Sequence, residues 1–305
     1  MKRKEVFFDS KGTRCAGDFY WPNNFIGQIP CLVMGHGGSG TKRLGLPKYA
    51  EKFVELGIAV FAFDYRGFGV SEGEPRQLLD IEKQQEDYKV AINFVRKNPN
   101  INPQKIALWG TSFSGGHVLA VAASDPLIAA VISQVPLIDG KYRGRDVKEN
   151  HSWKITKLKL RYIGAAIIDI TGSWFGKSPY FVPVIAEPGE LAAFIEPEAR
   201  IAFEALGGEN TGWKNALAPR FFFNFFFKGL PKYKEGTAEK LKMPLLMCVA
   251  DNDTQASAQF ATEVALKAPN AEIKHYSVGH FEAYLSPHIE QMIQDQVNFL
   301  RKYFI

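Results

Sequence analysis

Short runs of β-branched and aromatic residues recur along this chain of 305 residues, and longer amphipathic segments separate most of them. This alternation is typical of a largely parallel sheet with helices on both faces. The sequence therefore predicts an α/β fold with an eight-stranded, mostly parallel sheet. The predicted strands span residues 5–9, 14–20, 30–35, 58–63, 105–109, 129–135, 244–250 and 271–276.

The pattern within the segments supports this fold. The central runs, such as IAVFAF at 58–63, are continuously apolar, as expected for strands that are buried on both faces. Apolar residues such as Leu46, Tyr49 and Phe53 recur at helical spacing. The first two strands are too close in sequence for a crossover helix, so we expect them to pair antiparallel.

One long interval interrupts the alternation. Between residues 139 and 242 the sequence has helix-like segments broken by Pro and Gly, without a clear strand. An interval of this length predicts a helical insertion. We therefore expect an α/β core of residues 1–138 and 243–305 and a helical cap of residues 139–242. Basic residues gather at 141–161, either as the solvated face of a helix or as a surface for an anionic group.

Composition excludes several classes of protein. The 24 Phe, 11 Tyr and 5 Trp supply ample apolar surface for a folded core, and the net charge of +5 is too small to indicate nucleic-acid binding. No apolar run reaches the roughly 20 residues of a membrane span. Glu5 and Asp9 interrupt any secretory core after the basic N-terminus, and the three cysteines lack metal-ligand spacing. We expect a cytoplasmic protein without metal or cofactor, and homo-oligomerisation stays open.

A serine motif lies at 108–116, LWGTSFSGG, directly after a predicted strand and before a predicted helix. A serine at such a sharp turn is exposed above the sheet edge, with the N-terminus of the helix beneath it. The positions two before and two after this serine must be small. Gly110 meets that need, and Ser114 replaces the more usual glycine. Ser112 is the predicted nucleophile.

A serine nucleophile needs a base, and the chain has six histidines. His280 follows the last predicted strand, at the same edge of the sheet as Ser112, where open α/β sheets bind their ligands. His275 lies within that strand and is expected to point into the packing, whereas His117 falls inside the helix after Ser112. His280 is therefore the predicted base.

Two further parts complete the predicted site. Asp251 and Asp253 both follow the strand 244–250 and could orient the histidine, and spacing alone favours neither. The segment 35–40, GHGGSG, lacks the Lys-Ser/Thr of a P-loop, so we expect its backbone N–H groups to stabilise an oxyanion. The N–H of Phe113 should be the other donor.

With these parts in this order, the whole chain resembles an α/β-hydrolase. The segment 63–73, FDYRGFGVSEG, is similar to a loop of esterases and Xaa-Pro peptidase relatives. The segments 74–77 (EPRQ), 109–117 (WGTSFSGGH) and 187–192 (EPGELA) resemble the polyketide transferase-like branch. The resemblance implies the following roles: nucleophile Ser112, acid Asp253, base His280, and oxyanion donors Gly38 and Phe113.

These residues predict a serine hydrolase that forms an acyl-enzyme and cleaves small-molecule carboxylic esters or thioesters. An acyltransferase would use the same residues and pass the acyl group to an alcohol or amine. A peptidase is less favoured, because no carboxylate pair is evident for a substrate amino terminus. A non-catalytic binding protein is also less favoured, because every catalytic part is present.

The substrate pocket is expected in the insertion, which would lie above Ser112. The run 221–227, FFFNFFF, is apolar around a whole helix and must be covered on more than one side. We expect Phe222 and Phe226, with Trp174 and Phe181, to line an apolar acyl pocket. The alternative is that these rings only join the cap to the core.

Overall fold

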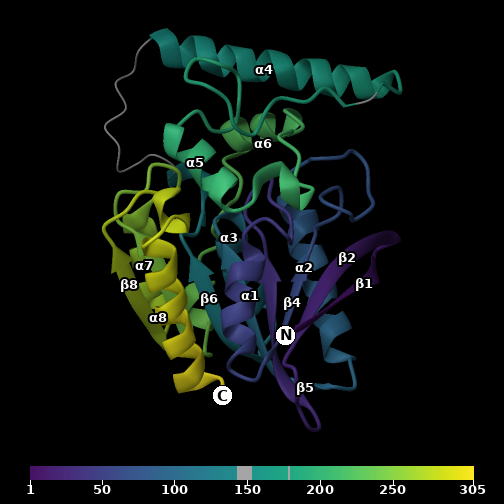
Figure 1. Cartoon of the computed structure of the whole chain (residues 1–305). Coiled ribbons are helices and arrows are strands. Elements are labelled where there is room, and N and C mark those ends of the chain that lie inside the picture. Colours follow the sequence, from purple (N-terminus) through teal and green to yellow (C-terminus); the bar gives the residue numbers. More distant parts are fainter. Residues whose placement is uncertain (143–152, 178) are drawn as a thin grey trace.

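The computed structural model describes residues 1–142, 153–177 and 179–305, except for the side chains of residues 153–159, 226 and 227. Within them, one eight-stranded sheet has the order β1-β2-β4-β3-β5-β6-β7-β8 (Figure 1). The prediction of an α/β fold with eight strands is confirmed. The strands are β1 (Lys2–Ser10), β2 (Thr13–Trp21), β3 (Ile29–Gly35), β4 (Ala59–Phe63), β5 (Ile101–Thr111), β6 (Ile128–Gln134), β7 (Leu245–Ala250) and β8 (Ala271–Tyr276).

Strand pairing follows the expected pattern. β1 and β2 form an antiparallel hairpin, and its two turn residues, Lys11 and Gly12, have φ of 52° and 82°. Positive φ at both positions is the geometry of a tight hairpin turn. β2 also pairs antiparallel with β4, and all pairs from β4 to β8 are parallel. The carboxyl ends of β3 to β8 therefore meet at one edge of the sheet.

Helices cover both faces because the strand residues alternate between two apolar clusters. Phe61 and Phe63 of β4 face one cluster, whereas Val60 and Ala62 face the other. The first cluster is shared with α2, α3 and α7, and the second with α1 and α8. These helices are α1 (Leu46–Val54), α2 (Ile81–Arg96), α3 (Phe113–Ala122), α7 (Ala258–Lys267) and α8 (His288–Tyr303).

The described part of the interval 139–242 lies above the carboxyl edge of the sheet (Figure 1). This described part contains helices and two isolated bridges, Val182–Leu217 and Ile185–Phe194, and no strand. The helices are α4 (Trp153–Trp174), α5 (Pro197–Ala205) and α6 (Arg220–Lys228), with 3-10 turns η1 (Gly140–Tyr142), η2 (Gly208–Thr211) and η3 (Ala238–Lys240); a fourth, η4 (Glu282–Tyr284), precedes α8.

An ion pair holds the outermost helix in place. The Arg220 guanidinium of α6 binds the buried Asp169 carboxylate of α4, with Nε 2.6 Å from Oδ2 and Nη2 2.9 Å from Oδ1. α4 thus lies outside α6, and α6 lies between α4 and the sheet (Figure 1). The site at the sheet edge is therefore covered by α5 and α6, not by α4.

Candidate active site

Ser112 occupies the turn between β5 and α3 with φ of 55° and ψ of −116°. A positive φ is strained for a residue with a side chain, and here the surrounding backbone maintains it. The Ser112 N–H donates to the Gln134 carbonyl (2.9 Å), and its carbonyl accepts from the N–H of Leu137 (2.9 Å). A Cβ on Gly110 would lie 2.0 Å from the Ser114 carbonyl oxygen, so this turn requires glycine there.

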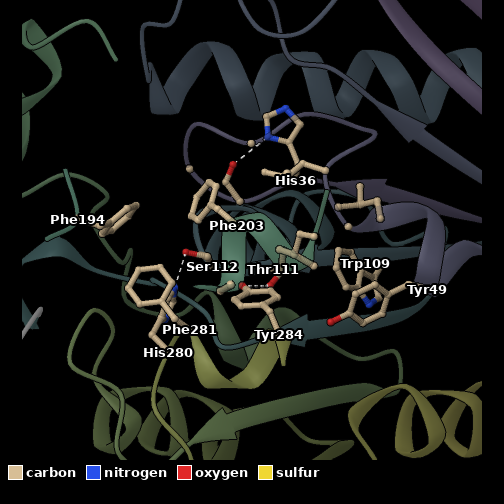
Figure 2. Close-up of a pocket in the computed structure, with 18 residues that line it drawn as sticks. His36, Tyr49, Trp109, Thr111, Ser112, Phe194, Phe203, His280, Phe281 and Tyr284 are labelled. Carbon is tan, nitrogen blue, oxygen red and sulfur yellow. Dashed lines mark hydrogen bonds between the residues drawn. The ribbon is translucent and has the colours of Figure 1, made fainter. Parts of the chain in front are cut away.

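His280 connects Ser112 to Asp253. Its Nε2 lies 3.2 Å from the Ser112 Oγ, and its Nδ1 lies 2.7 Å from Asp253 Oδ2 (Figure 2 shows the serine contact). Because an ionised carboxylate only accepts hydrogen bonds, the ring proton belongs on Nδ1, which leaves the Nε2 lone pair for the serine hydroxyl. His280 and Asp253 are each 5% exposed, so the pair is shielded from water.

The Asp253 carboxylate is held on both oxygens. Its Oδ1 accepts from the backbone N–H groups of Gln255 (2.7 Å) and Ala256 (2.8 Å), while Oδ2 faces His280. Hydrogen bonds from backbone N–H groups favour the ionised carboxylate and fix its orientation. The loop after β7 thus orients the imidazole that follows β8.

Asp251, the other aspartate, pairs with a different histidine. Its Oδ1 lies 2.6 Å from Nδ1 of His275, and the two side chains are 38% and 47% exposed. The expectation that His275 points into the packing was therefore wrong. His275 lies near the end of β8, an edge strand with a neighbour on one side only, and its side chain faces solvent.

His117 and His36 are both buried, and neither forms the hydrogen bond with Ser112 that His280 forms. Burial lowers the pKa of His117 to about 3, and its Nε2 lies 2.9 Å from Gln84 Oε1. Burial also lowers the pKa of His36, whose Nδ1 lies 2.8 Å from the Gly37 carbonyl. Both imidazoles are therefore neutral at pH 7, while His151 lies outside the described residues.

The glycine-rich loop after β3 lies against the serine turn. A Cβ on Gly38 would come within 2.6 Å of the Phe113 ring, so glycine permits this close approach. The N–H of Phe113 is in the first turn of α3, where an N–H has no acceptor within its own helix. Gly38 and Phe113 thus lie side by side, and with Ser112 they line the same pocket.

Two pockets meet at Ser112 in the described part of the chain. The first lies over α1 and the end of β5 (Figure 2). The second lies against α6 and the start of α3. Residues that contribute to both are Gly38, Ser112, Phe194 and His280. Residues of the first pocket alone include Tyr49, Trp109, Thr111, Phe203, Phe281 and Tyr284, and those of the second include Leu79, Phe113, Phe221, Phe222, Phe225 and Gln255.

Of the three predicted pocket residues whose side chains are described, the structure brings one to the site. Phe222, 4% exposed, lines the second pocket. Trp174 and Phe181 are 76% and 39% exposed, and neither is among the described residues of the two pockets. Trp174 ends α4, the outer helix, and its side chain faces solvent. The Phe226 side chain lies outside the described residues.

The phenylalanine run serves both of the roles considered for it. The Phe221 ring packs against Phe113 at a centroid distance of 5.7 Å, and the Phe222 ring packs against Tyr162 at 4.4 Å. Both rings also line the second pocket. The same buried face of α6 thus joins the insertion to the core and forms a pocket wall, while Phe223 is 40% exposed.

Several of the residues that line the pockets were not predicted from the sequence. Phe194 and Phe203 lie in the insertion, where no periodicity distinguishes a pocket ring from a core ring. Tyr49 and Trp109 have the apolar spacing of core residues, and they are buried, but they also line the first pocket. Periodicity signals burial alone, so it could not have shown that these side chains face a cavity.

The described residues give little support to catalysis by a cysteine thiolate or by a metal ion. The cysteines are buried, and burial raises the pKa of the Cys15 and Cys248 thiols to about 12, which disfavours a reactive thiolate. In the described ranges, no cluster of His, Cys, Asp and Glu could hold a metal ion, and none of the helices is long and apolar enough to span a bilayer. Most of the basic stretch 141–161 lies outside the described side chains.

Comparison with known proteins finds similar sequences among named hydrolases. The sequence pattern of the X-Pro dipeptidyl-peptidase family (S15 family) matches residues 11–159. The quorum-quenching protein AidA of Acinetobacter baumannii (strain MDR-ZJ06) is 41% identical over 98% of this chain and 94% of its own. Thiohydrolase aneE of Aspergillus aculeatus (strain ATCC 16872 / CBS 172.66 / WB 5094) is 36% identical over 63% of this chain and 58% of its own.

The fold is likewise shared with a solved enzyme structure. The crystal structure of the α/β hydrolase GrgF from Penicillium sp. sh18 matches with a TM-score of 0.79 and 25% identity, over 100% of this chain and 99% of that one. The full-length likeness to AidA and to GrgF extends from the first strand to the last helix. Proteins named thiohydrolase and polyketide transferase are similar over shorter stretches of this chain. This chain therefore belongs to the α/β-hydrolase superfamily of enzymes, in the family of AidA.

Proposed function

We propose that this protein is a serine hydrolase that cleaves carboxylic esters or thioesters through an acyl-enzyme on Ser112. His280 is the proposed base and Asp253 the proposed acid. The observation that carries the proposal is the continuous hydrogen-bonded path from the Ser112 Oγ through His280 to Asp253, beside two pockets. Nucleophile, base and orienting carboxylate within hydrogen-bond reach are the signature of acyl transfer.

In the first half-reaction, the Ser112 Oγ attacks the substrate carbonyl carbon while its proton moves to the His280 Nε2. The carbonyl oxygen becomes an oxyanion, which the N–H groups of Gly38 and Phe113 stabilise. The bond to the leaving alcohol or thiol then breaks, and His280 returns the proton to that leaving group. Asp253 stays ionised throughout and stabilises the imidazolium.

In the second half-reaction, a water attacks the acyl-enzyme and gives its proton to His280. The second oxyanion collapses, the bond to the Ser112 Oγ breaks, and His280 returns the proton to the serine. The products are a carboxylic acid and the free enzyme. The interval 139–242, with α5 and α6 above the sheet edge, is the proposed cap that limits the access of water.

Contacts between this cap and the catalytic loops support that role. The Trp213 indole N–H donates to the Ser39 carbonyl of the glycine-rich loop (2.7 Å). The Gln255 amide donates to Glu196 Oε1, at the start of α5 (2.6 Å). The cap thus binds both the loop that supplies Gly38 and the loop that supplies Asp253. A cytoplasmic location stays a prediction.

An acyltransferase is the second candidate, in which an alcohol or amine takes the acyl group instead of water. The two pockets that meet at Ser112 favour it, since one can hold the acyl group while the other holds an acceptor. Similar proteins are named polyketide transferases. Adding an alcohol during turnover separates the candidates: a transferase forms the new ester as its main product, and a hydrolase forms mainly acid.

The experiment that tests the proposal combines labelling and turnover. A fluorophosphonate probe should label the wild type but not Ser112→Ala, and the wild type should hydrolyse a panel of acyl esters and thioesters of increasing chain length. An X-Pro anilide should not be cleaved. Labelling of folded Ser112→Ala at the wild-type rate would refute the assignment of the nucleophile. Absence of turnover on every ester would favour a non-catalytic binding protein.

A further inference from the structure

A buried chain of hydrogen bonds ends at the wall of the first pocket. The Trp109 indole N–H lies 2.8 Å from Gln296 Oε1, and the Gln296 Nε2 lies 2.7 Å from Gln134 Oε1. The Gln134 Nε2 in turn lies 3.0 Å from the Tyr49 hydroxyl and 3.3 Å from the Thr111 hydroxyl. Gln134 and Gln296 are fully buried, at 0% exposure.

The direction of every bond in this chain follows from its first donor. An indole N–H can only donate, so Gln296 must turn its carbonyl oxygen toward Trp109. Its amide nitrogen then faces Gln134 and donates, which obliges Gln134 to present its own carbonyl oxygen there. The Gln134 NH₂ group is consequently directed at the two hydroxyl groups on the pocket wall.

The three hydroxyl groups on this wall carry more protons than their hydrogen bonds use. The oxygens of Tyr49 and Thr111 accept from Gln134, and the Thr111 hydroxyl shares one further hydrogen bond with the Tyr284 hydroxyl (2.6 Å). Three hydroxyl groups carry three protons, and only the bond between Thr111 and Tyr284 uses one of them. Among the described residues, two protons therefore have no acceptor: that of Tyr49 and one of the Thr111–Tyr284 pair.

These spare donors lie beside the proposed catalytic histidine, in a pocket whose other side chains are apolar except for His36, Ser112 and His280. Tyr49, Thr111 and Tyr284 all line the first pocket, and the Tyr284 ring packs edge-on against His280 at 6.3 Å. In Figure 2 the Thr111–Tyr284 pair lies next to Ser112, with Tyr49 farther along the pocket. Burial raises the pKa of both tyrosines, so they keep their protons. An oxygen of a bound ligand could accept from these donors.

We propose that the first pocket is a subsite for an oxygen-bearing part of the substrate, hydrogen-bonded by Tyr49 and by the Thr111–Tyr284 pair. A keto, hydroxyl or ether oxygen in the chain would accept from these donors, whereas a plain alkyl chain would leave them unpaired. This inference rests on the proposed hydrolysis at Ser112. It deepens that function by naming oxygenated chains as the preferred substrate class.

The oxygen could lie on the acyl side or on the leaving-group side of the scissile bond, and two substrate series distinguish these. One series compares octanoyl thioesters with 3-oxo-, 5-oxo- and 7-oxo-octanoyl thioesters of the same thiol. The other compares alkyl esters with ether-bearing esters of the same acid. Each yields a ratio of kcat/KM for the oxygenated substrate over its plain counterpart.

Tyr49→Phe and Tyr284→Phe should each lower this ratio about tenfold in one of the two series, since a site built to hydrogen-bond a group discriminates against its absence. Tyr162→Phe is the matched control. The buried Tyr162 hydroxyl donates to the Ala192 carbonyl in the cap, and Tyr162 is not among the lining residues of either pocket. This substitution should leave every ratio unchanged. Phe203→Leu, in the first pocket, should change kcat/KM by the same factor for both substrates of a pair.

Unchanged ratios in Tyr49→Phe and Tyr284→Phe across both series would overturn the proposal, as would an equal loss on oxygenated and plain substrates. Failure of the proposed function would look different, because the wild type would then turn over no plain ester. In that case, calorimetric binding of octanoic and oxo-octanoic acids to Ser112→Ala, with and without Tyr49→Phe, measures the same preference without catalysis. Equal affinities for the acids with Tyr49 intact would refute the subsite.

Discussion

The Ser114 hydroxyl donates a hydrogen bond to the backbone carbonyl of His36, and it accepts one from the Tyr65 hydroxyl at 2.6 Å. Ser114 lies two residues after Ser112, the proposed nucleophile, and His36 lies two residues before Gly38. The bond therefore ties the turn that presents Ser112 to the loop that carries the proposed oxyanion donor. A serine at a position where glycine is more usual thus has a positioning role.

Ser114→Gly should lower kcat for an activated ester about tenfold with KM little changed, because a displaced oxyanion donor affects mainly the transition state. The buried Tyr65 hydroxyl would also lose its acceptor, at a cost of about 1–3 kcal/mol in unfolding free energy. Steady-state kinetics and denaturant unfolding measure the two effects.

Ser133→Ala is the control for stability, because its buried hydroxyl also donates to a backbone carbonyl, that of Gly115 (2.8 Å), but makes no contact with the loop that carries Gly38 in the described hydrogen bonds. It should destabilise the protein to a similar extent and retain kcat. A wild-type kcat in Ser114→Gly would show that this hydrogen bond only stabilises the fold.

The two Asp–His pairs offer a matched comparison within one protein. Asp253→Asn should lower kcat by about three to four orders of magnitude, because an amide favours the wrong imidazole tautomer of His280. Asp251→Asn alters a solvent-exposed pair with His275 and should leave kcat within about twofold, as exposed pairs contribute little. The assignment of the acid would be wrong if Asp251→Asn were the more damaging change.

Substitutions of the α6 rings should have different effects on chain-length preference, depending on whether the ring faces a pocket or solvent. Phe222→Ala enlarges the second pocket, so the kcat/KM optimum should move toward longer acyl chains, with a loss of about 3–5 kcal/mol in stability. Phe223→Ala, on the 40% exposed ring of the same helix, should keep the wild-type chain-length profile. Identical profiles for wild type and Phe222→Ala would mean that the acyl chain binds elsewhere.

The buried His117 should make stability depend on pH. Its pKa is lowered from 6.5 to about 3 by burial, so between these values the unfolded chain binds a proton that the folded protein does not. Stability is full above pH 6.5 and falls as the pH drops toward 3, by up to about 1.4 kcal/mol per pH unit. Urea unfolding at pH 7, 6 and 5 should show a shallower loss in His117→Gln, and parallel pH profiles would contradict this account.

The fold could be predicted from the sequence because its signals are local. Period-two and helical spacings, the hairpin that begins the sheet and the strand–serine–helix turn depend on residues near one another in the chain. Parallel strands then bring the segments that follow β3, β5, β7 and β8 to a common edge. That is why the sequence alone could place Ser112, His280 and the glycine-rich loop at one edge of the sheet.

The tertiary structure alone decided the contacts between distant segments. Asp251 and Asp253 are two residues apart, and only the packing of the loop after β7 against the segment from β8 to His280 directs one to His275 and the other to His280. Trp174 was expected to line the pocket, but the Arg220–Asp169 ion pair holds its helix outside α6. Hydrophobic spacing indicates that a side chain is buried and carries no information about whether it meets another side chain or a cavity. Apart from Phe222, the residues proposed to recognise the substrate, Tyr49, Thr111 and Tyr284 among them, therefore emerged only from the folded chain.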